Sequence, residues 1–301
     1  SLVQCNLIGV ARLFSNRRPG NAMTANSITV LKDASSLRRQ IADWRKAGEK
    51  IGLVPTMGAL HEGHLSLVRA AKDAGATRVI VSIFVNPTQF APNEDFNTYP
   101  KRVAEDLADL GKLGVHAAFT PDVDTMYPKG FNTTVLPEGP VVADLEAAVR
   151  PTHFAGVATV VCKLFNLVQP DLAVFGEKDY QQLMVIGQMV RDLNIPVQII
   201  GAPIVRDEKG LALSSRNAYL SADELAVARQ FNVVVRKVSE RKITPDEGVK
   251  ALLDAGVAAV DYLVIRDAET LGEPVESRPQ RVVSVARVGR VRLLDNMAVT
   301  G

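Results

Sequence analysis

Two histidines three residues apart are the side chains of this sequence best placed to do chemistry. His61 and His64 lie in V-P-T-M-G-A-L-H-E-G-H-L, residues 54–65, directly after the apolar run 51–54. This pattern predicts a strand that ends at a glycine-containing turn and leads into a helix whose first turn carries both imidazoles on one face. The backbone N–H groups of the turn and the positive end of the helix dipole would form an anion-binding corner. The chain has 4 histidines, so finding two here points to phosphate chemistry on a nucleotide.

Simpler explanations of this histidine pair must be weighed against that one. A zinc-protease helix carries H-E-x-x-H, whereas this segment reads H-E-G-H, so that motif is absent. Cys5 and Cys162 are far away in sequence, and nothing nearby completes a metal site. Taken alone, the pair could be an ordinary helix start with incidental histidines. Lys178, between two acidic residues, could likewise be an exposed charged turn.

The composition is that of an ordinary globular protein with one large domain or two smaller ones. The chain has 301 residues, of which 47% are hydrophobic and 23% charged, and its net charge is +2. No run of Lys and Arg alternates with aromatic residues, so nucleic acid is not the expected partner. The 2 cysteines lack C-x-x-C spacing, which favours a reducing compartment. Because no apolar stretch approaches the roughly 20 residues needed to cross a bilayer, we expect a cytoplasmic enzyme without a membrane partner.

Residues 1–26 are expected to be a leader or an extension outside the fold. Residues 1–32 contain no Asp or Glu but do contain Arg12, Arg17 and Arg18, and Met23 is a second plausible start.

Short β-branched runs alternate with amphipathic segments in the predicted first domain, residues 27–204. Strands are predicted at 28–31, 51–55, 78–85, 117–120, 172–175 and 197–200. Helices are predicted at 34–47, 64–74, 103–113, 157–168 and 180–193. This alternation indicates an α/β fold with a parallel sheet covered on both faces. Such sheets bind ligands at the carboxyl ends of their strands, where T-M-G, N-P-T-Q and G-E-K-D are expected.

A smaller α+β domain is predicted for residues 205–301. A charged turn at 206–210 precedes L-S-S-R-N, and a long helix begins after Ser221, with Glu224 at the capping-box position. A shorter helix begins near Pro245, and β-rich runs follow at 259–266, 281–286 and 291–294.

Five motifs together closely resemble those of one known family. Neither G-x-x-x-x-G-K-[ST] nor G-x-G-x-x-G occurs, which argues against a P-loop phosphotransferase and a dinucleotide oxidoreductase. Instead, the sequence resembles the pantoate–β-alanine ligase (pantothenate synthetase) family in P-T-M-G-A-L-H-E-G-H-L, F-V-N-P-T-Q-F, R-P-T-H-F-A-G-V, F-G-E-K-D-Y-Q-Q-L and L-S-S-R-N. The motifs keep their order from about residue 28 onward. The resemblance implies a Rossmann-like nucleotidyltransferase core, a C-terminal lid domain, a homodimer, and ATP and Mg²⁺ as reactants.

The resemblance also implies a two-step reaction. Pantoate and ATP form a pantoyl adenylate and pyrophosphate, and β-alanine then attacks the adenylate and releases AMP. A carboxylate that attacks the α-phosphate is already ionised and needs no general base, so the main task is to stabilise charge on the phosphoryl oxygens and on pyrophosphate. The implied catalytic residues are His61, His64 and Lys178, with His64 as the proton donor.

The family roles carry over residue by residue. The implied ATP site consists of Met57, Gly58, Ala59, Leu60, His61, Glu62, Gly63, His64, Gly176, Glu177, Lys178, Asp179, Val205, Leu213, Ser214, Ser215 and Arg216. The implied pantoate and β-alanine site consists of Gln89, Gln182, Asn86 and Tyr99. An acidic metal cluster maps to Glu105, Asp106 and Asp109, of which only the pairs 105/109 and 106/109 share a helix face. We expect His153 only to support the helix that follows it.

The sequence departs from the family pattern at two positions near these sites. Ala147 stands where the family usually has glycine, which removes positive-φ freedom from the loop 146–149, so its closure over pantoate does not follow for this chain. Leu213 replaces a usual methionine, but a backbone contact with ATP should survive this change.

Two other functions remain open at this point. Another adenylyltransferase of the same superfamily would transfer AMP to a phosphate-bearing acceptor, for which extra basic residues would be needed. A regulatory protein would bind ATP without turnover, but the presence of His61, His64 and Lys178 argues against it.

Overall fold

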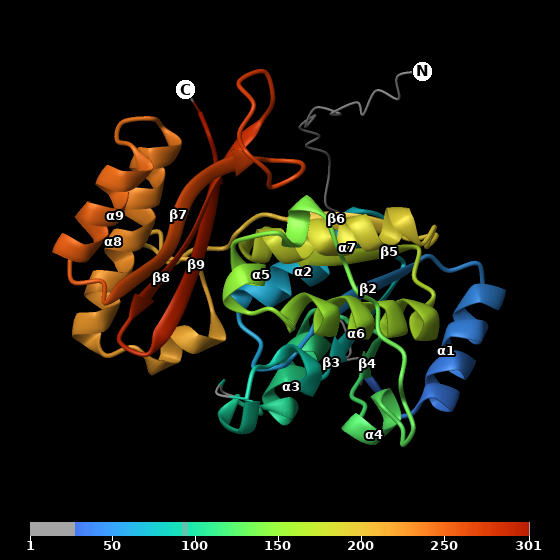
Figure 1. Cartoon of the computed structure of the whole chain (residues 1–301). Coiled ribbons are helices and arrows are strands. Elements are labelled where there is room, and N and C mark those ends of the chain that lie inside the picture. Colours follow the sequence, from blue (N-terminus) through green and yellow to red (C-terminus); the bar gives the residue numbers. More distant parts are fainter. Residues whose placement is uncertain (1–27, 93, 95, 301) are drawn as a thin grey trace, which may run out of the picture.

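Six parallel strands form the larger sheet of the molecule (Figure 1). The computed structural model describes residues 28–92, 94 and 96–300, so the leader or extension expected at residues 1–26 lies outside the described residues. The strands are β1 (Thr29–Leu31), β2 (Ile51–Thr56), β3 (Arg78–Ile83), β4 (Ala117–Phe119), β5 (Leu172–Gly176) and β6 (Gln198–Ala202). The α/β class with a parallel sheet is therefore confirmed.

The strand order creates a crevice in the middle of this sheet. The order is β1-β4-β3-β2-β5-β6, with every neighbouring pair parallel. On one side of β2 lie β3 and then β4, and on the other side lie β5 and then β6. The point where the strand order reverses lies between β2 and β5, and ligands bind there at the carboxyl ends of the strands. The segments that follow β2 and β5 therefore face a common crevice.

Helices cover both faces of the larger sheet. The first face packs against α1 (Ala34–Lys46), α6 (His153–Val168) and α7 (Tyr180–Asp192), and the second against α2 (Glu62–Asp73) and α3 (Val103–Lys112). Alternation along β3 explains how both faces become apolar: Ile80 belongs to the first cluster, whereas Val79 and Val81 belong to the second. A strand buried on both faces reads as one continuous apolar run, as the sequence does here.

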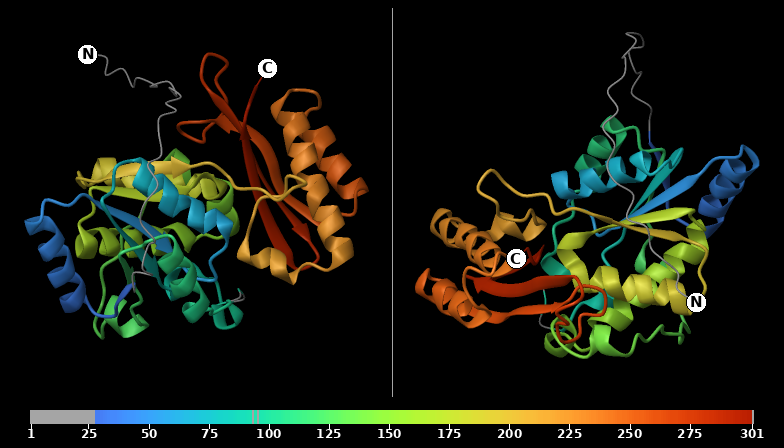
Figure 2. Two further views of the ribbon diagram at one scale, coloured as in Figure 1. Left: turned by 180° about the vertical axis from the view of Figure 1, so that it is seen from behind. Right: turned by 90° about the horizontal axis from the view of Figure 1, so that it is seen from above.

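A second, antiparallel sheet forms the C-terminal unit, which lies beside the larger unit in both views of Figure 2. Its strands are β7 (Ala259–Asp267), β8 (Gln280–Val288) and β9 (Val291–Ala298), and α8 (Ala222–Ser239) and α9 (Pro245–Asp254) cover one face. Ser221 caps α8 with Glu224 in a capping box, as predicted. On the other face, Tyr262 and Val283 pack into the core of the larger unit. The C-terminal sheet is therefore held between its own helices and the larger unit.

The structure differs from the sequence prediction between residues 140 and 157. Residues 146–149, expected to be a loop, form the short helix α5 (Glu146–Val149), and α6 begins at His153 rather than near residue 157. Ala147 lies inside α5 and does not have a positive φ; Leu145, with φ 65°, makes the turn instead. In this conformation, position 147 therefore does not need the positive φ that glycine would allow. The remaining short elements are α4 (Val123–Met126), η1 (Pro87–Gln89), η2 (Phe96–Thr98), η3 (Pro140–Val142), η4 (Glu177–Asp179) and η5 (Ser215–Tyr219).

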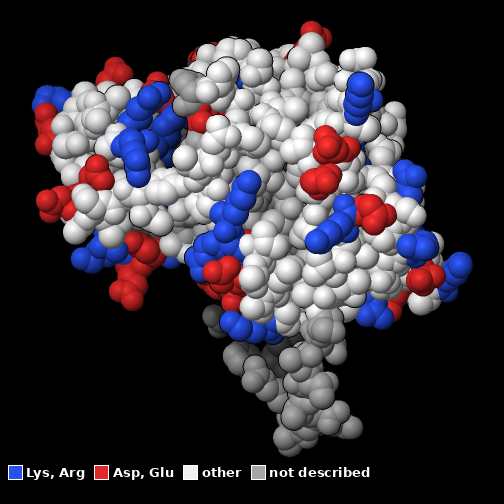
Figure 3. All heavy atoms as spheres, turned by 90° about the horizontal axis from the view of Figure 1, so that it is seen from below, with Lys and Arg blue, Asp and Glu red and all other residues white. Residues whose placement is uncertain are grey.

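Charges on the surface are mixed in sign on the face shown in Figure 3, where Lys and Arg lie among Asp and Glu. No helix within the described residues is long and apolar enough to cross a membrane.

Candidate active site

His61 and His64 form a compact pair at the start of α2. The helix begins at Glu62 and His61 is its N-cap, so His61 lies just before the first turn and not within it as predicted. The Gly63 N–H donates to His61 Nδ1 (3.0 Å), the His61 N–H donates to His64 Nδ1 (3.3 Å), and the ring centroids are 4.2 Å apart. Glycine at position 63 leaves room for the His61 ring, because a Cβ there would lie 2.7 Å from that ring and would displace it. The H-E-G-H spacing thus builds a reciprocal cap that fixes both rings.

Both rings are neutral hydrogen-bond donors near neutral pH. Burial lowers the pKa of His61 to about 4, and the positive charge of Lys178 adds to this effect. Burial lowers the pKa of His64 to about 3, with smaller effects from His61 and Lys178. Each Nδ1 accepts a backbone hydrogen bond, so in the neutral ring the hydrogen resides on Nε2. This state favours hydrogen-bond donation by His64 over the proton donation that the family resemblance implied.

We expect ¹⁵N-imidazole NMR to show His61 and His64 as neutral Nε2–H tautomers at pH 7.5 and still neutral at pH 5.5. Because their folded-state pKa values lie below the ordinary 6.5, protonation favours the unfolded chain. Their contribution to stability is therefore present above pH 6.5 and is lost as the pH falls from 6.5 toward about 4 for His61 and about 3 for His64. An imidazolium signal with a midpoint near pH 6.5 at either ring would contradict this assignment.

The turn between β2 and α2 is not the anion-binding corner that the sequence suggested. The N–H groups of Ala59 and Leu60 donate to the two carboxylate oxygens of Asp106 on α3, at 2.9 and 2.8 Å. The Gly58 N–H donates to the Thr56 hydroxyl at 3.2 Å. These donors are already used within the protein, so the histidine Nε2–H groups and Lys178 are the better candidates to meet phosphate oxygens.

The same contacts correct the predicted metal cluster. Asp106 is buried and faces the turn, Glu105 is exposed, and Asp109 bonds Lys112 at 2.8 Å. Across the described ranges, no group of three His, Cys, Asp or Glu side chains could hold a metal ion. The prediction of a site at Glu105, Asp106 and Asp109 was therefore wrong, because Asp106 serves as an internal cap for the turn. The described side chains therefore do not form a group of three such ligands that could hold Mg²⁺ by itself.

Lys178 lies across the crevice in the η4 turn, which the C-terminal sheet holds in place. The Asn296 side-chain amide on β9 donates to the carbonyl oxygens of Glu177 (2.8 Å) and Lys178 (3.0 Å). Arg281 on β8 also bonds Glu177 at 3.2 Å. Lys178 Nζ is 3.8 Å from Asp179 Oδ2, which is longer than a hydrogen bond. The lysine can therefore turn toward an anion in the crevice.

Gln89 is oriented from the opposite side of the crevice by a buried amide network. The Asn86 amide nitrogen donates to Gln89 Oε1 (3.0 Å) and to the Gly156 carbonyl (3.2 Å), and Gln89 Nε2 donates to the Met57 sulfur at 3.3 Å. A Cβ on Gly156 would lie 2.3 Å from the Thr88 carbonyl, so glycine lets α6 approach η1 closely. The prediction that Asn86 supports the Gln89 pocket agrees with these contacts.

The predicted residues meet in a cavity of about 250 Å³ between the carboxyl edge of the sheet and the segment 213–216. Those that line it are Met57, His61, Gly63, His64, Asn86, Gln89, Tyr99, Gly176, Lys178, Asp179, Gln182, Val205, Leu213, Ser214, Ser215 and Arg216. The Tyr99 hydroxyl is 3.3 Å from Ser215 Oγ, so these two residues join the two sides of the cavity.

Five residues predicted for the ATP site do not line the cavity: Gly58, Ala59, Leu60, Glu62 and Glu177. Ala59 and Leu60 are buried behind the turn on Asp106, and Glu62 forms an exposed ion pair with Arg69. A contact between these five residues and ATP stays a prediction.

Arg150 and His153 line the cavity, although neither was predicted to lie there. His153 Nδ1 donates to the Gln89 carbonyl (2.9 Å), and its Nε2 faces Arg150 at 3.3 Å, which fixes the Nδ1–H tautomer. Burial and the Arg150 charge lower the pKa of His153 to about 4, so this ring is also neutral. The only sequence signal was the R-P-T-H-F motif itself, whose spacing does not reveal that it faces Gln89.

The floor of the cavity is mostly apolar. Pro55, Ser82 and Phe175 come from neighbouring strands, and the α6 residues Val157, Val160, Val161 and Leu164 form the adjoining wall. Ser82 is only 1% exposed, and its Oγ has no hydrogen-bond partner among the residues that the structure describes. A buried hydroxyl of this kind is costly unless a ligand or water satisfies it. The floor therefore suits an apolar group with a polar atom near Ser82.

Comparison with known proteins gives one consistent result. Residues 29–298 match the family model described as pantoate-beta-alanine ligase. A pantothenate synthetase of Mesorhizobium japonicum is 51% identical over 277 residues, which is 90% of this chain and 97% of the relative. A crystal structure of the Thermus thermophilus pantothenate synthetase superposes with a TM-score of 0.82 at 43% identity, covering 91% of this chain and 100% of that one.

A further structure contains bound ligands. The pantoate-beta-alanine ligase of Francisella tularensis, solved in complex with beta-gamma ATP and β-alanine, has a TM-score of 0.80 at 36% identity and covers 91% of this chain and 99% of that one. The fold, the match over nearly the whole described length and these identities lead to one conclusion: the chain belongs to the pantoate–β-alanine ligase family, whose members are ligases that form an amide bond.

Proposed function

We propose that this chain condenses pantoate with β-alanine to give pantothenate, with ATP as co-substrate and a pantoyl adenylate as the intermediate. One observation carries the proposal: two neutral imidazoles, one lysine and two glutamine amides line the same cavity at the carboxyl edge of the sheet. Family membership supports the overall reaction. The adenylate and the residue roles below are inferred from the geometry.

In the first step, a pantoate carboxylate oxygen attacks the α-phosphorus of ATP, and the bond from that phosphorus to the pyrophosphate oxygen breaks. Negative charge grows on the phosphoryl oxygens and on the leaving pyrophosphate. His61 and His64 would donate Nε2–H hydrogen bonds to these oxygens, and Lys178 would supply a full positive charge. Fixed donors suit this task, because they need not reorganise as the charge develops.

In the second step, the β-alanine amine attacks the acyl carbon, and the carbon–oxygen bond to AMP breaks. For pantoate itself, Gln89 and Gln182 would pair with its carboxylate and hydroxyl groups from opposite sides of the cavity. The apolar floor would take its two methyl groups, and Ser82 would meet a hydroxyl group. A small polyol acid fits these groups better than a phosphate-bearing acceptor would.

ATP is proposed to lie along the lining residues of the histidine turn, the η4 turn and the segment 213–216. Mg²⁺ would arrive bound to the ATP phosphates, because the described side chains do not provide a group of three ligands that could hold it without them.

The setting of the enzyme is also a proposal. We propose a homodimer in the cytoplasm, with no nucleic acid or membrane partner, from family membership and the modest net charge of +2. We place the boundary between the two domains near residues 204 and 205, which the end of β6 at Ala202 supports.

We expect pantoate-dependent exchange of labelled pyrophosphate into ATP in the absence of β-alanine. The first step can run backward whenever the adenylate stays enclosed, so exchange needs pantoate but not the amine. The measurement is incorporation of ³²P from pyrophosphate into ATP, with and without pantoate. Exchange that strictly requires β-alanine would contradict the separate adenylation step.

A further inference from the structure

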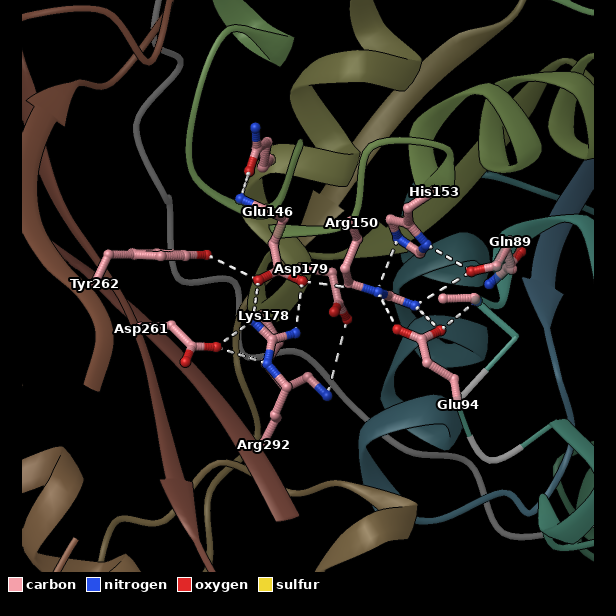
Figure 4. A network of polar contacts seen from close by, with 12 residues as sticks. Gln89, Glu94, Glu146, Arg150, His153, Lys178, Asp179, Asp261, Tyr262 and Arg292 are labelled. Carbon is pink, nitrogen blue, oxygen red and sulfur yellow. Dashed lines mark hydrogen bonds and ion pairs between the residues drawn. The ribbon is translucent and has the colours of Figure 1, made fainter. Parts of the chain in front are cut away.

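A buried carboxylate links the C-terminal sheet to the wall of the cavity. Glu146 on α5 is 5% exposed. Arg292 on β9 donates to both of its oxygens, at 2.6 and 3.1 Å, and the Tyr262 hydroxyl on β7 donates at 3.4 Å. Arg150 is farther away, with 3.6 Å between its NH1 and Glu146 Oε2 (Figure 4). Arg292 is therefore the main partner of this carboxylate.

Arg150 uses its hydrogen bonds on the side that faces the cavity. It donates to both oxygens of Glu94, at 2.6 and 2.7 Å, and to the Gln89 carbonyl at 3.2 Å. Its NH1 also faces His153 Nε2 at 3.3 Å, and His153 holds the same Gln89 carbonyl. Figure 4 shows Arg150 with Glu94 and His153 on one side and Glu146 on the other. The backbone of Gln89 is thus fixed by Arg150 and by the histidine that Arg150 orients.

Each carboxylate that contacts Arg150 has its own arginine partner, so Glu146 does not compete with Gln89 for Arg150. Glu146 has Arg292, and Glu94 has Arg150. Asp261 is shared by Arg292 and Arg287, with oxygen–nitrogen distances of 2.8 and 3.1 Å. If Arg292 were lost, the buried Glu146 carboxylate would keep Arg150 as its one cationic partner among the described residues. A buried carboxylate without a strong partner is unfavourable, so it would attract that guanidinium.

We propose that Arg292 is a positioning residue for pantoate: by holding the Glu146 carboxylate, it leaves Arg150 to hold Gln89 and His153 at the cavity. This inference rests on the proposed binding of pantoate by Gln89. It makes the C-terminal sheet part of the pantoate site although Arg292 does not line the cavity.

The first test compares two arginines that face each other across β8 and β9. Arg287 and Arg292 are direct partners in the strand register and both bind Asp261, but of the two only Arg292 has a contact with Glu146. We expect Arg292→Gln to raise the pantoate KM about tenfold, the effect of weakening one hydrogen bond to a charged partner. The exchange rate at saturating pantoate and the affinity for ATP should stay within about twofold. Arg287→Gln should leave the pantoate KM within about twofold of the wild type.

The second test removes the carboxylate that competes for Arg150. In the double variant Glu146→Gln/Arg292→Gln, Arg150 has no buried charge to move toward, so the pantoate KM should return to within about twofold of the wild type. Glu146→Gln alone should also stay near the wild type. This single variant keeps the proposal testable even if Arg292→Gln fails to fold, which circular dichroism would reveal.

A readout without substrate separates this inference from the proposed function. The ¹⁵N signals of the His153 imidazole report the position of Arg150, and they should change in Arg292→Gln but not in Arg287→Gln or the double variant. Absence of pantoate-dependent exchange in the wild type would overturn the proposed function alone. Equal effects of the two arginine variants, no rescue in the double variant, or a raised pantoate KM in Glu146→Gln would each overturn the positioning role.

Discussion

Replacing His64 with alanine is expected to slow the adenylation of pantoate by about 10² to 10³, the effect of losing one preorganised hydrogen-bond donor at a developing charge. Alanine would remove both a cap contact that the structure shows and the donor role that we propose for His64. Its Nδ1 accepts the His61 N–H as part of the helix cap, and its ring lines the cavity, where the proposed donor is Nε2–H. The measurement is the rate of pyrophosphate exchange at saturating ATP and pantoate. His61→Ala should have an effect of the same size, because its ring is fixed in the same tautomer.

Two further substitutions separate the cap from the donor. The side-chain oxygen of asparagine can take the place of Nδ1 in the cap, but His64→Asn has no donor at the Nε2 position, so it should be as slow as His64→Ala. His64→Gln places an amide N–H near Nε2 and loses the cap, so it should keep more activity. If His64→Asn kept near-normal pyrophosphate exchange, with the fold intact by circular dichroism, His64 would act only as part of the helix cap.

Lys178→Ala and Gln182→Ala are expected to fail in different ways. Lys178 brings a point charge to the phosphates, so its loss should weaken ATP binding and lower the adenylation rate by about 10², comparable with the loss of a preorganised donor. Gln182 is neutral and contributes little to charge on phosphorus. Its loss should raise the pantoate KM by about tenfold, the effect of an unmade hydrogen bond to a charged group, and leave ATP binding near normal.

Calorimetric titration of ATP into both variants, with pantoate saturation curves alongside, makes this comparison. Gln188→Ala is a matched control, since Gln188 lies on the same helix and bonds the Glu138 carbonyl at an exposed position. If Gln182→Ala abolished ATP binding while Lys178→Ala spared both ATP binding and adenylation, the two halves of the cavity would have been assigned the wrong way round.

The elements of the larger sheet could be predicted because their sequence patterns are local. Continuous apolar runs such as 51–54 mark strands buried on both faces, and glycine-containing turns mark their ends. The carboxyl ends of such strands share one edge of the sheet, so His61 could be expected to lie near Lys178 despite their separation in sequence. The structure brings both residues to one cavity. Family motifs then supplied the substrates, which spacing alone does not.

What the sequence did not reveal depends on pairings between distant segments. Asp106, which lies on α3, accepts hydrogen bonds from the Ala59 and Leu60 N–H groups. These N–H groups were predicted to be free to bind an anion, and Asp106 was predicted to bind a metal. The single contact between them occupies both. Similarly, Arg150 and Glu94 are separated by 56 positions, and Arg292 and Glu146 by 146. No periodicity encodes such pairs, because each requires the complete arrangement of both sheets. The same is true of the depressed histidine pKa values, which arise from burial.

The position of an oxygen label tests the adenylate most directly. Pantoate labelled with ¹⁸O in its carboxylate is incubated with the protein, ATP and β-alanine, and the products are analysed by mass spectrometry. Attack of the carboxylate on the α-phosphorus, followed by release of AMP from the acyl carbon, predicts one ¹⁸O atom in AMP, none in pyrophosphate, and one in the amide carbonyl of pantothenate. Label in pyrophosphate or inorganic phosphate, or AMP without label, would contradict the pantoyl adenylate.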